Sequence, residues 1–269
     1  MKDYQACLLD LDGVVYRGEQ ALPGARELVE WLDVTGRRPL YLSNNSFATP
    51  EQVAEKLSRL GMPRPEGRVL TAGWAASRML ARRLPGGDVY VLAVPSVAGM
   101  VAEAGLRVVW ADAEDGPMPQ AVLVGLDRSL TYDRLRRGLR AIMGGAAFIA
   151  VNRDPRLPIE DGFEPGTGAI VTALEYASGQ VAEIVGKPAP GIVFEALRQV
   201  GVAAEDALMV GDGLDLDVRA GHAAGVDTAL VLTGLTTHAE AEAATGDRKP
   251  TYVFDDLHAL LAALRQAAR

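Results

Sequence analysis

Residues 6–18 read ACLLDLDGVVYRG, an apolar run that ends in two carboxylates and a glycine. The run from Ala6 to Leu9 predicts a short buried parallel strand, which would place Asp10 and Asp12 at its carboxyl end. Gly13 then allows the backbone to turn sharply. Open α/β sheets bind their ligands at the carboxyl ends of the strands, so the acidic pair lies at a predicted site. Two like charges this close need a neutralising partner, and a divalent cation serves best.

The composition is that of an ordinary soluble globular chain of 269 residues, 49% hydrophobic and 23% charged. The net charge of -8 argues against nucleic acid as a partner, because a duplex-binding surface needs a positive stripe. Cys7 is the single cysteine and cannot form an internal disulfide, so we expect a reducing compartment and a cytoplasmic protein. No apolar stretch approaches the roughly 20 residues of a membrane span, and no signal peptide precedes the first strand, so we expect no membrane partner.

Apolar strands and amphipathic helices alternate along the chain. The first helix is predicted over residues 25–34, where Leu28, Trp31 and Leu32 form an apolar stripe at helical spacing. Pro85-Gly86-Gly87 is the first candidate domain boundary, and the alternation restarts after it. Strands alternating with helices in this way predict an α/β fold with a doubly wound parallel sheet and right-handed crossovers.

Polar residues follow three more predicted strands. They are Ser43 and Asn44 at the end of the strand that begins at residue 38, Lys187 after 182–186, and Asp212 and Asp217 after 207–210. Parallel strands present their carboxyl ends at one edge of a sheet, so we expect these side chains to converge with Asp10 and Asp12. Such a set suggests phosphoryl transfer, in which one carboxylate is the nucleophile, oxygen ligands hold a divalent cation, a hydroxyl and an ammonium bind phosphate, and a second carboxylate transfers protons.

These motifs resemble those of the haloacid dehalogenase superfamily of phosphatases. The four motifs match at Asp10-Leu11-Asp12-Gly13, at Ser43, at Lys187 and at Gly211-Asp212 through Asp217. Residues 13–18 (GVVYRG), 43–45 (SNN) and 186–188 (GKP) are further similar to the NagD-like, 4-nitrophenylphosphatase-type branch. The resemblance implies a Rossmann-like catalytic core of residues 1–85 and 181–269. It also implies an inserted α/β cap of residues 86–180 that determines substrate specificity.

The resemblance also implies a role for each motif residue. Asp10 would be the nucleophile that forms an aspartyl-phosphate, and Asp12 the general acid and base. Phosphate would be bound by Ser43, Asn44 and Lys187, and Mg2+ by Asp10, the carbonyl oxygen of Asp12, and Asp212, with Asp217 behind these ligands.

The fourth motif departs from the family pattern at one position. The family often has Thr before the final Asp, where this chain has Leu216. The Gly-Asp-x-x-x-x-Asp spacing favours Asp217 as the residue that completes the motif, and Asp215, two residues earlier, is the alternative.

In the predicted cap, Asn152-Arg153-Asp154 follows a strand and resembles the Asn-x-Asp cap motif of the family. Arg153 could bind a substrate anion bidentately, or it could be an ordinary exposed loop arginine. Caps of this kind often supply a homodimer contact.

The leading hypothesis is a Mg2+-dependent phosphomonoesterase that hydrolyses a small phosphorylated metabolite through an aspartyl-phosphate. Dehalogenation needs no metal cluster, so Asp212 and Asp217 speak against it, and phosphonate cleavage needs a residue other than Asp at position 12. A phosphoacceptor domain without turnover is a further alternative, but such domains are much shorter and carry the acceptor on a middle strand. The physiological substrate is left open.

Overall fold

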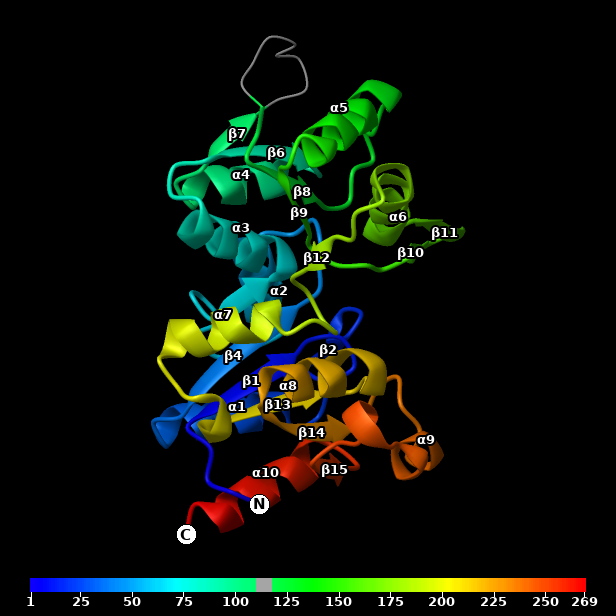
Figure 1. Cartoon of the computed structure of the whole chain (residues 1–269). Coiled ribbons are helices and arrows are strands. Elements are labelled where there is room, and N and C mark those ends of the chain that lie inside the picture. Colours follow the sequence, from blue (N-terminus) through cyan, green and yellow to red (C-terminus); the bar gives the residue numbers. More distant parts are fainter. Residues whose placement is uncertain (110–117) are drawn as a thin grey trace. The chain divides into compact units, whose positions relative to one another are not determined.

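The computed structural model describes residues 1–109 and 118–269, which form two compact units (Figure 1). The first unit comprises residues 1–43, 50–70 and 187–269, and the second comprises residues 44–49 and 71–186. Residues 44–49, 71–85 and 181–186 belong to the second unit, whereas they were predicted to lie in the core. No helix among the described residues is long and apolar enough to cross a membrane.

The first unit is built on a six-stranded sheet in the order β15-β14-β13-β1-β4-β5, in which the five strands from β15 to β4 are parallel to one another. Its strands are β1 (Ala6–Asp10), β4 (Arg38–Ser43), β5 (Val69–Thr71), β13 (Ala207–Gly211), β14 (Asp227–Val231) and β15 (Tyr252–Phe254). Strand β1 lies in the interior of the sheet, between β13 and β4, and its first four residues are buried. A strand covered on both faces reads as a continuous apolar run, which is why residues 6–9 predicted it correctly.

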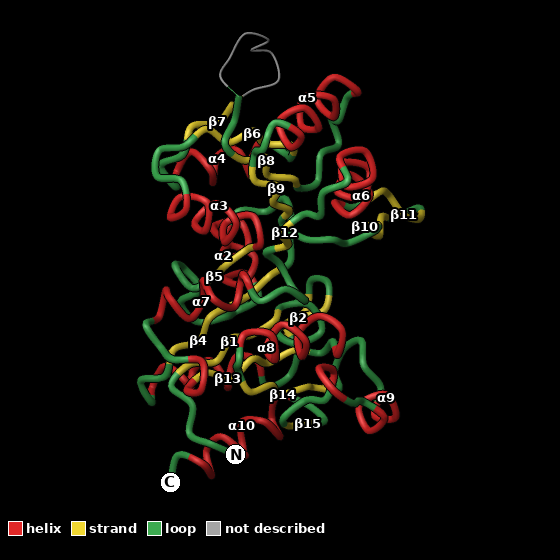
Figure 2. The backbone as a smooth tube through the Cα atoms, in the orientation of Figure 1, coloured by secondary structure: helices red, strands yellow, loops and turns green. Residues whose placement is uncertain are grey.

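Helices cover both faces of this sheet (Figure 2). They are α1 (Ala25–Val34), α2 (Pro50–Arg59), α7 (Gly191–Val200), α8 (Arg219–Ala224), α9 (His238–Ala243) and α10 (Leu257–Ala267). The connection from β1 through α1 leads to β4, toward the β5 end of the sheet. The connection from β13 through α8 leads to β14, toward the opposite, β15 end. Right-handed crossovers therefore put α1 and α8 on opposite faces, and the predicted doubly wound α/β class is confirmed.

A small antiparallel hairpin follows β1 and was not predicted. It consists of β2 (Tyr16–Arg17) and β3 (Gln20–Ala21). The turn before it is tight, because the amide of Gly13 donates to the carbonyl oxygen of Tyr16 at 2.8 Å and Gly13 has a φ of 79°. The hairpin therefore starts directly beyond the acidic pair of the first motif.

The second unit contains its own five-stranded sheet in the order β12-β9-β8-β6-β7, all parallel. Its strands are β6 (Asp88–Leu92), β7 (Arg107–Val109), β8 (Ala121–Val124), β9 (Ala147–Ala150) and β12 (Glu183–Ile184), and its helices are α3 (Ala72–Arg83), α4 (Pro95–Glu103), α5 (Tyr132–Met143) and α6 (Thr167–Ser178). An antiparallel hairpin of β10 (Arg156–Ile159) and β11 (Gly162–Pro165) completes the unit and was also not predicted. The predicted second α/β layer is thus present.

Helix α3 packs within the second unit, although the predicted boundary at Pro85 placed it in the first. The hydroxyl of Thr71 caps its first turn by accepting from the amide of Trp74 at 3.3 Å. A side chain at Gly73 would meet Met100 and Val97 of α4, so the absence of one brings the two helices close together.

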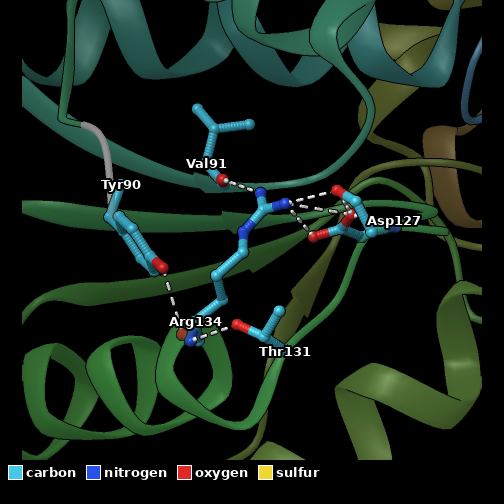
Figure 3. Close-up of polar contacts among 6 residues, drawn as sticks. Tyr90, Val91, Asp127, Thr131 and Arg134 are labelled. Carbon is cyan, nitrogen blue, oxygen red and sulfur yellow. Dashed lines mark hydrogen bonds and ion pairs between the residues drawn. The ribbon is translucent and has the colours of Figure 1, made fainter. Parts of the chain in front are cut away.

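A buried polar network joins α5 to the sheet of the second unit (Figure 3). The guanidinium of Arg134 lies 2.9 Å from the carboxylate of Asp127, whose side chain is 1% exposed, and it also donates to the carbonyl oxygen of Val91 at 3.3 Å. The hydroxyl of Tyr90 donates to the carbonyl oxygen of Arg134, and the hydroxyl of Thr131 accepts from its amide. This network links the first turn of α5 to the chain around β6 and β8.

Candidate active site

The ammonium group of Lys187 lies between two carboxylates in the first unit. Its Nζ is 2.5 Å from Oδ1 of Asp10 and 2.6 Å from Oδ1 of Asp217, and the Lys187 side chain is 3% exposed. Asp10 is the last residue of β1, and Asp217 follows the carboxyl end of the neighbouring strand β13. The strand ends therefore bring together residues that are about 200 positions apart in the sequence, as the parallel sheet predicted.

Three carboxylates meet at this edge of the sheet. One oxygen each of Asp10, Asp212 and Asp217 lies within 4.8 Å of the others, close enough to share one cation. The donors are all oxygens, which suits a hard divalent cation such as Mg2+ or Ca2+. The residues present therefore fit a metal of this kind.

Burial and mutual repulsion raise the pKa values of two of these carboxyls. Burial, and then the charge of Asp217, raise the pKa of Asp10 to about 7, although Lys187 opposes the shift. Burial and Asp217 likewise raise the pKa of Asp212 to about 6. Burial alone would lower the pKa of Lys187, but the carboxylates of Asp10 and Asp217 outweigh it and hold that pKa above its usual value. Lys187 is therefore positively charged at neutral pH.

A single turn of π-helix, Leu214–Val218, determines which acid of the fourth motif enters the cluster. The amides of Asp217 and Val218 both donate to the carbonyl oxygen of Gly213, at 3.0 and 3.2 Å. Asp217 is 2% exposed and accepts from the amide of Gly213 through its second oxygen. Asp215 is exposed and pairs with Arg248 at 2.9 Å. The structure thus places Asp217 with Lys187 and directs Asp215 elsewhere.

Asp212 is 3% exposed and is enclosed by the backbone of two glycines. A Cβ atom on Gly13 or on Gly234 would overlap the Asp212 carboxylate. The amide of Leu235 donates to Oδ2 of Asp212 at 2.7 Å. Sequence reasoning missed residues 233–236, although they follow the carboxyl end of β14 and could have been found by the rule that identified Ser43.

Asp12 and Ser43 lie on the same edge of the sheet. Ser43 is the last residue of β4, one residue beyond Leu42, the partner of Asp10 in the parallel register. Asp12 is exposed and stands two residues beyond β1. Among the described residues, the carboxylates close enough to share one cation are those of Asp10, Asp212 and Asp217, and the side chain of Asp12 is not one of them.

The predicted cap residues lie in the second unit and have partners there. The amide group of Asn152, which is 1% exposed, donates to the carbonyl oxygen of Asn44 at 2.7 Å and so anchors residues 44–49. Its own Oδ1 accepts from the amide of Asp154 at 3.4 Å. Arg153 is half exposed and forms a two-pronged ion pair with Glu175 of α6. Arg153 would therefore have to leave Glu175, or share it, to bind a substrate anion.

Known proteins resemble this chain over nearly its whole length. The family model for haloacid dehalogenase-like hydrolases matches residues 7–107, and a HAD-hydrolase-like model matches residues 184–260. An acid sugar phosphatase from Staphylococcus aureus is 36% identical over 266 residues, which is 99% of this chain and 100% of that protein. A p-nitrophenyl phosphatase from Archaeoglobus fulgidus has a TM-score of 0.88 at 34% identity, covering 97% of this chain and 100% of its own. A glycerol phosphate phosphatase from Mycobacterium tuberculosis, solved in complex with magnesium, has a TM-score of 0.83 at 36% identity, and the match covers 96% of this chain and 76% of that protein's chain.

The sheet carries an acidic cluster and a lysine at its carboxyl edge, and the relatives are phosphatases. Together they define a hydrolase of phosphoric monoesters whose fold is of the α/β class. The chain belongs to the haloacid dehalogenase-like hydrolase family. The structural likeness to nitrophenylphosphatases also confirms the predicted branch of that family.

Proposed function

We propose that the chain is a Mg2+-dependent phosphatase that hydrolyses a small phosphorylated metabolite through an aspartyl-phosphate on Asp10. The observation that carries the proposal is the position of Lys187, whose ammonium contacts Asp10 and Asp217 while Asp212 lies close by. A carboxylate nucleophile beside a permanent positive charge and an oxygen-only cation site is an arrangement well suited to phosphoryl transfer through a covalent intermediate. Asp10, Asp212 and the carbonyl oxygen of Asp12 would hold Mg2+, which when bound neutralises charge on the phosphoryl oxygens.

The protein groups then divide the chemistry among themselves. An oxygen of Asp10 attacks phosphorus, while Lys187, Ser43 and Asn44 bind the phosphoryl oxygens. Asp12 donates a proton to the leaving alcohol and later takes one from the water that hydrolyses the aspartyl-phosphate. The exposure of Asp12 supports this role, because a general acid and base must meet both the leaving group and water.

The relatives support a phosphorylated sugar or polyol as the substrate class. One is an acid sugar phosphatase and another a glycerol phosphate phosphatase. We assign substrate choice to the second unit, with Asn152, Arg153 and Asp154 as candidate specificity residues. Cytoplasmic location and a homodimer through the second unit stay predictions, and size-exclusion chromatography with light scattering tests the latter.

Quenched-flow kinetics with nitrophenyl phosphate tests the proposed chemistry. We expect Asp10→Asn to abolish turnover and any burst of nitrophenolate. We expect Asp12→Asn to give a burst of up to one equivalent followed by slow turnover, because nitrophenolate departs without a proton whereas hydrolysis of the phosphoenzyme needs a base. With a sugar phosphate, both steps should fail in Asp12→Asn, each by about 10²- to 10⁴-fold.

Asp215→Asn is the matched control, since Asp215 lies in the same π-helical turn as Asp217 but pairs with Arg248. It should keep full activity. Equal impairment of Asp12→Asn on both substrates, without trapped phosphoenzyme, would contradict the role of Asp12. Wild-type release of only one equivalent would instead identify a phosphoacceptor without turnover, and activity after exhaustive chelation would exclude the metal.

A further inference from the structure

Residues 233–236 (TGLT), directly after β14 and Leu232, contact both the turn that follows Asp12 and the carboxylate cluster. The hydroxyl of Thr233 donates to the carbonyl oxygen of Gly13 at 2.6 Å. Two residues on, the amide of Leu235 donates to the carboxylate of Asp212 at 2.7 Å. One short segment therefore holds both the turn that follows Asp12 and the acid at the end of β13.

Two further contacts strengthen the attachment of this segment. The hydroxyl and amide of Thr236, which is 8% exposed, donate to the carbonyl oxygen of Asp212 at 2.6 and 3.2 Å. The guanidinium of Arg17, in the hairpin beyond Gly13, donates to the carbonyl oxygen of Thr233. Asp212 is thus held at both its backbone and its carboxylate, and the hairpin is joined to the same segment.

The packing around Asp212 leaves little room for adjustment. Gly13 and Gly234 lie on the carboxylate so closely that a methyl group on either would collide with it. A Cβ on Gly13 would also stand 3.1 Å from the Cα of Gly234. The turn after Asp12, the 233–236 segment and the Asp212 carboxylate therefore form one close-packed unit.

We propose that the 233–236 segment fixes the spacing between the turn that carries Asp12 and the Asp212 carboxylate, and thereby sets the affinity for Mg2+. This inference rests on the proposed function, in which both of these supply cation ligands. Thr233 is a positioning residue: its hydroxyl orients the peptide group next to the Asp12 carbonyl oxygen and touches no substrate. Groups that orient metal ligands typically influence metal affinity by about 10- to 100-fold.

Isothermal titration with Mg2+ alone, on the full-length metal-free protein, tests the proposal. We expect Thr233→Val, which keeps the shape but loses the donor, to weaken Mg2+ binding by about 10-fold or more. The Mg2+ concentration for half-maximal phosphatase activity should rise by the same factor, while kcat at saturating Mg2+ stays near the wild-type value. Thr233→Ser, which keeps the donor, should restore affinity.

Thr35→Val is the control, because the hydroxyl of Thr35 also donates to a backbone carbonyl, that of Trp31, at 2.7 Å. Thr35 is the residue at the end of α1, just before β4, and so lies at the amino edge of the sheet, opposite the carboxylate cluster. Thr35→Val should therefore leave Mg2+ affinity unchanged. Gly234→Ala adds a methyl group against the Asp212 carboxylate and should abolish Mg2+ binding, with folding checked by circular dichroism.

The outcomes separate this inference from the proposed function. A wild-type protein that binds no Mg2+ would overturn both. Wild-type binding that Thr233→Val retains in full would overturn the inference and leave the proposed function intact. The inference would also be wrong if Thr233→Val lowered kcat at unchanged Mg2+ affinity, or if Thr35→Val weakened Mg2+ binding equally.

Discussion

The ammonium group of Lys187 offsets the charge of two buried carboxylates, so its removal should destabilise the metal-free protein. Lys187→Met keeps much of the side-chain volume but leaves Asp10 and Asp217 without a counter-charge. Breaking a buried ion pair by removing one partner costs about 3–5 kcal/mol, and we expect a loss of that order in the free energy of unfolding. Urea denaturation followed by circular dichroism measures it.

Two further variants locate the cause of that loss. Adding Asp10→Asn to Lys187→Met should recover part of the lost stability, because one of the uncompensated charges is removed. Lys2→Met removes an exposed ion pair with Asp227 and should leave the urea midpoint unchanged. An unchanged midpoint in Lys187→Met itself would mean that the charge of Lys187 does not stabilise the cluster.

The raised pKa values of Asp10 and Asp212 predict how stability changes with pH. Folding raises them from a usual value of 3.8 to about 7 and about 6. Between about pH 4 and pH 7 the folded metal-free chain therefore binds more protons than the unfolded chain, so these groups make the free energy of unfolding fall as pH rises. Mg2+ competes with the same protons, and the stabilisation it gives should grow over that range.

Thermal melts at a series of pH values, with and without saturating Mg2+, check this expectation. Asp10→Asn should flatten the pH dependence of the metal-free protein, because the amide does not titrate. If the difference between wild type and Asp10→Asn does not change between pH 4 and pH 7, Asp10 does not hold the raised pKa.

Residue types and strand ends were enough to predict that Asp10, Lys187, Asp212 and Asp217 would meet, because parallel strands share a carboxyl edge. The ion pair of Arg153 with Glu175 could not be predicted in this way. Its partner lies on a helix 22 residues along the chain, and the pairing depends on how that helix packs. The 233–236 segment was predictable in principle, but its contact with the Asp212 carboxylate is made by the Leu235 amide, a backbone group that every residue except proline carries.

Among the elements, α5 depends on one buried pair at its first turn. Asp127→Ala would leave the guanidinium of Arg134, which is 19% exposed, without its carboxylate (Figure 3). Loss of a partner in such a pair costs about 3 kcal/mol, and we expect the unfolding transition of the second unit to shift by that order. Urea denaturation monitored by hydrogen exchange of α5 and β8 amides reports on the unit directly.

The control lies on the same helix. Asp133→Ala removes the exposed partner of Arg136, an ion pair three residues apart at 2.9 Å. Exposed pairs contribute little, so this variant should match the wild type within error. Equal destabilisation by both changes would show that helix propensity, and not the buried pair, decides the stability of α5.

The long, strongly periodic elements were predicted, and the short irregular ones were not. Residues 207–210 gave β13 because a buried parallel strand is uniformly apolar. The two hairpins, Tyr16–Ala21 and Arg156–Pro165, have no comparable pattern, and much of their surface is exposed. The π-helical turn at Leu214–Val218 was not predicted, because its backbone hydrogen bonds to Gly213 do not alter the hydrophobic spacing of the sequence.

For the whole molecule, we expect substrate choice to be separable from the chemical step. Glu175→Gln should weaken the hold on Arg153 while keeping its shape. If Arg153 binds a substrate anion, kcat/KM for substrates with a second anionic group should rise in Glu175→Gln and fall in Arg153→Ala, while nitrophenyl phosphate is hydrolysed as before. A panel of phosphorylated sugars, polyols and acids measures this. If Arg153→Ala lowered kcat/KM by the same factor for all substrates, that result would contradict a specificity role for Arg153.

The division of the chain into two α/β parts was predictable from the restart of the strand and helix alternation, whereas the exact limits were not. Pro85-Gly86-Gly87 is the strongest local punctuation, yet it is only the turn between α3 and β6. Helix α3 belongs to the second unit because it contacts α4 through Gly73. This is a tertiary contact, and no pattern in the local sequence predicts it.

The pairing of β1 with β13 also has a consequence for protein synthesis. Ala6 leaves the ribosome early, but its neighbour in the sheet, Ala207, is made only after the entire second unit. Residues 71–186 already contain all five strands of their own sheet and can form it while β1 has β4 as a neighbour but still lacks β13. The second unit can therefore form its sheet first, and the sheet edge that carries Asp10 is completed only when β13 emerges from the exit tunnel.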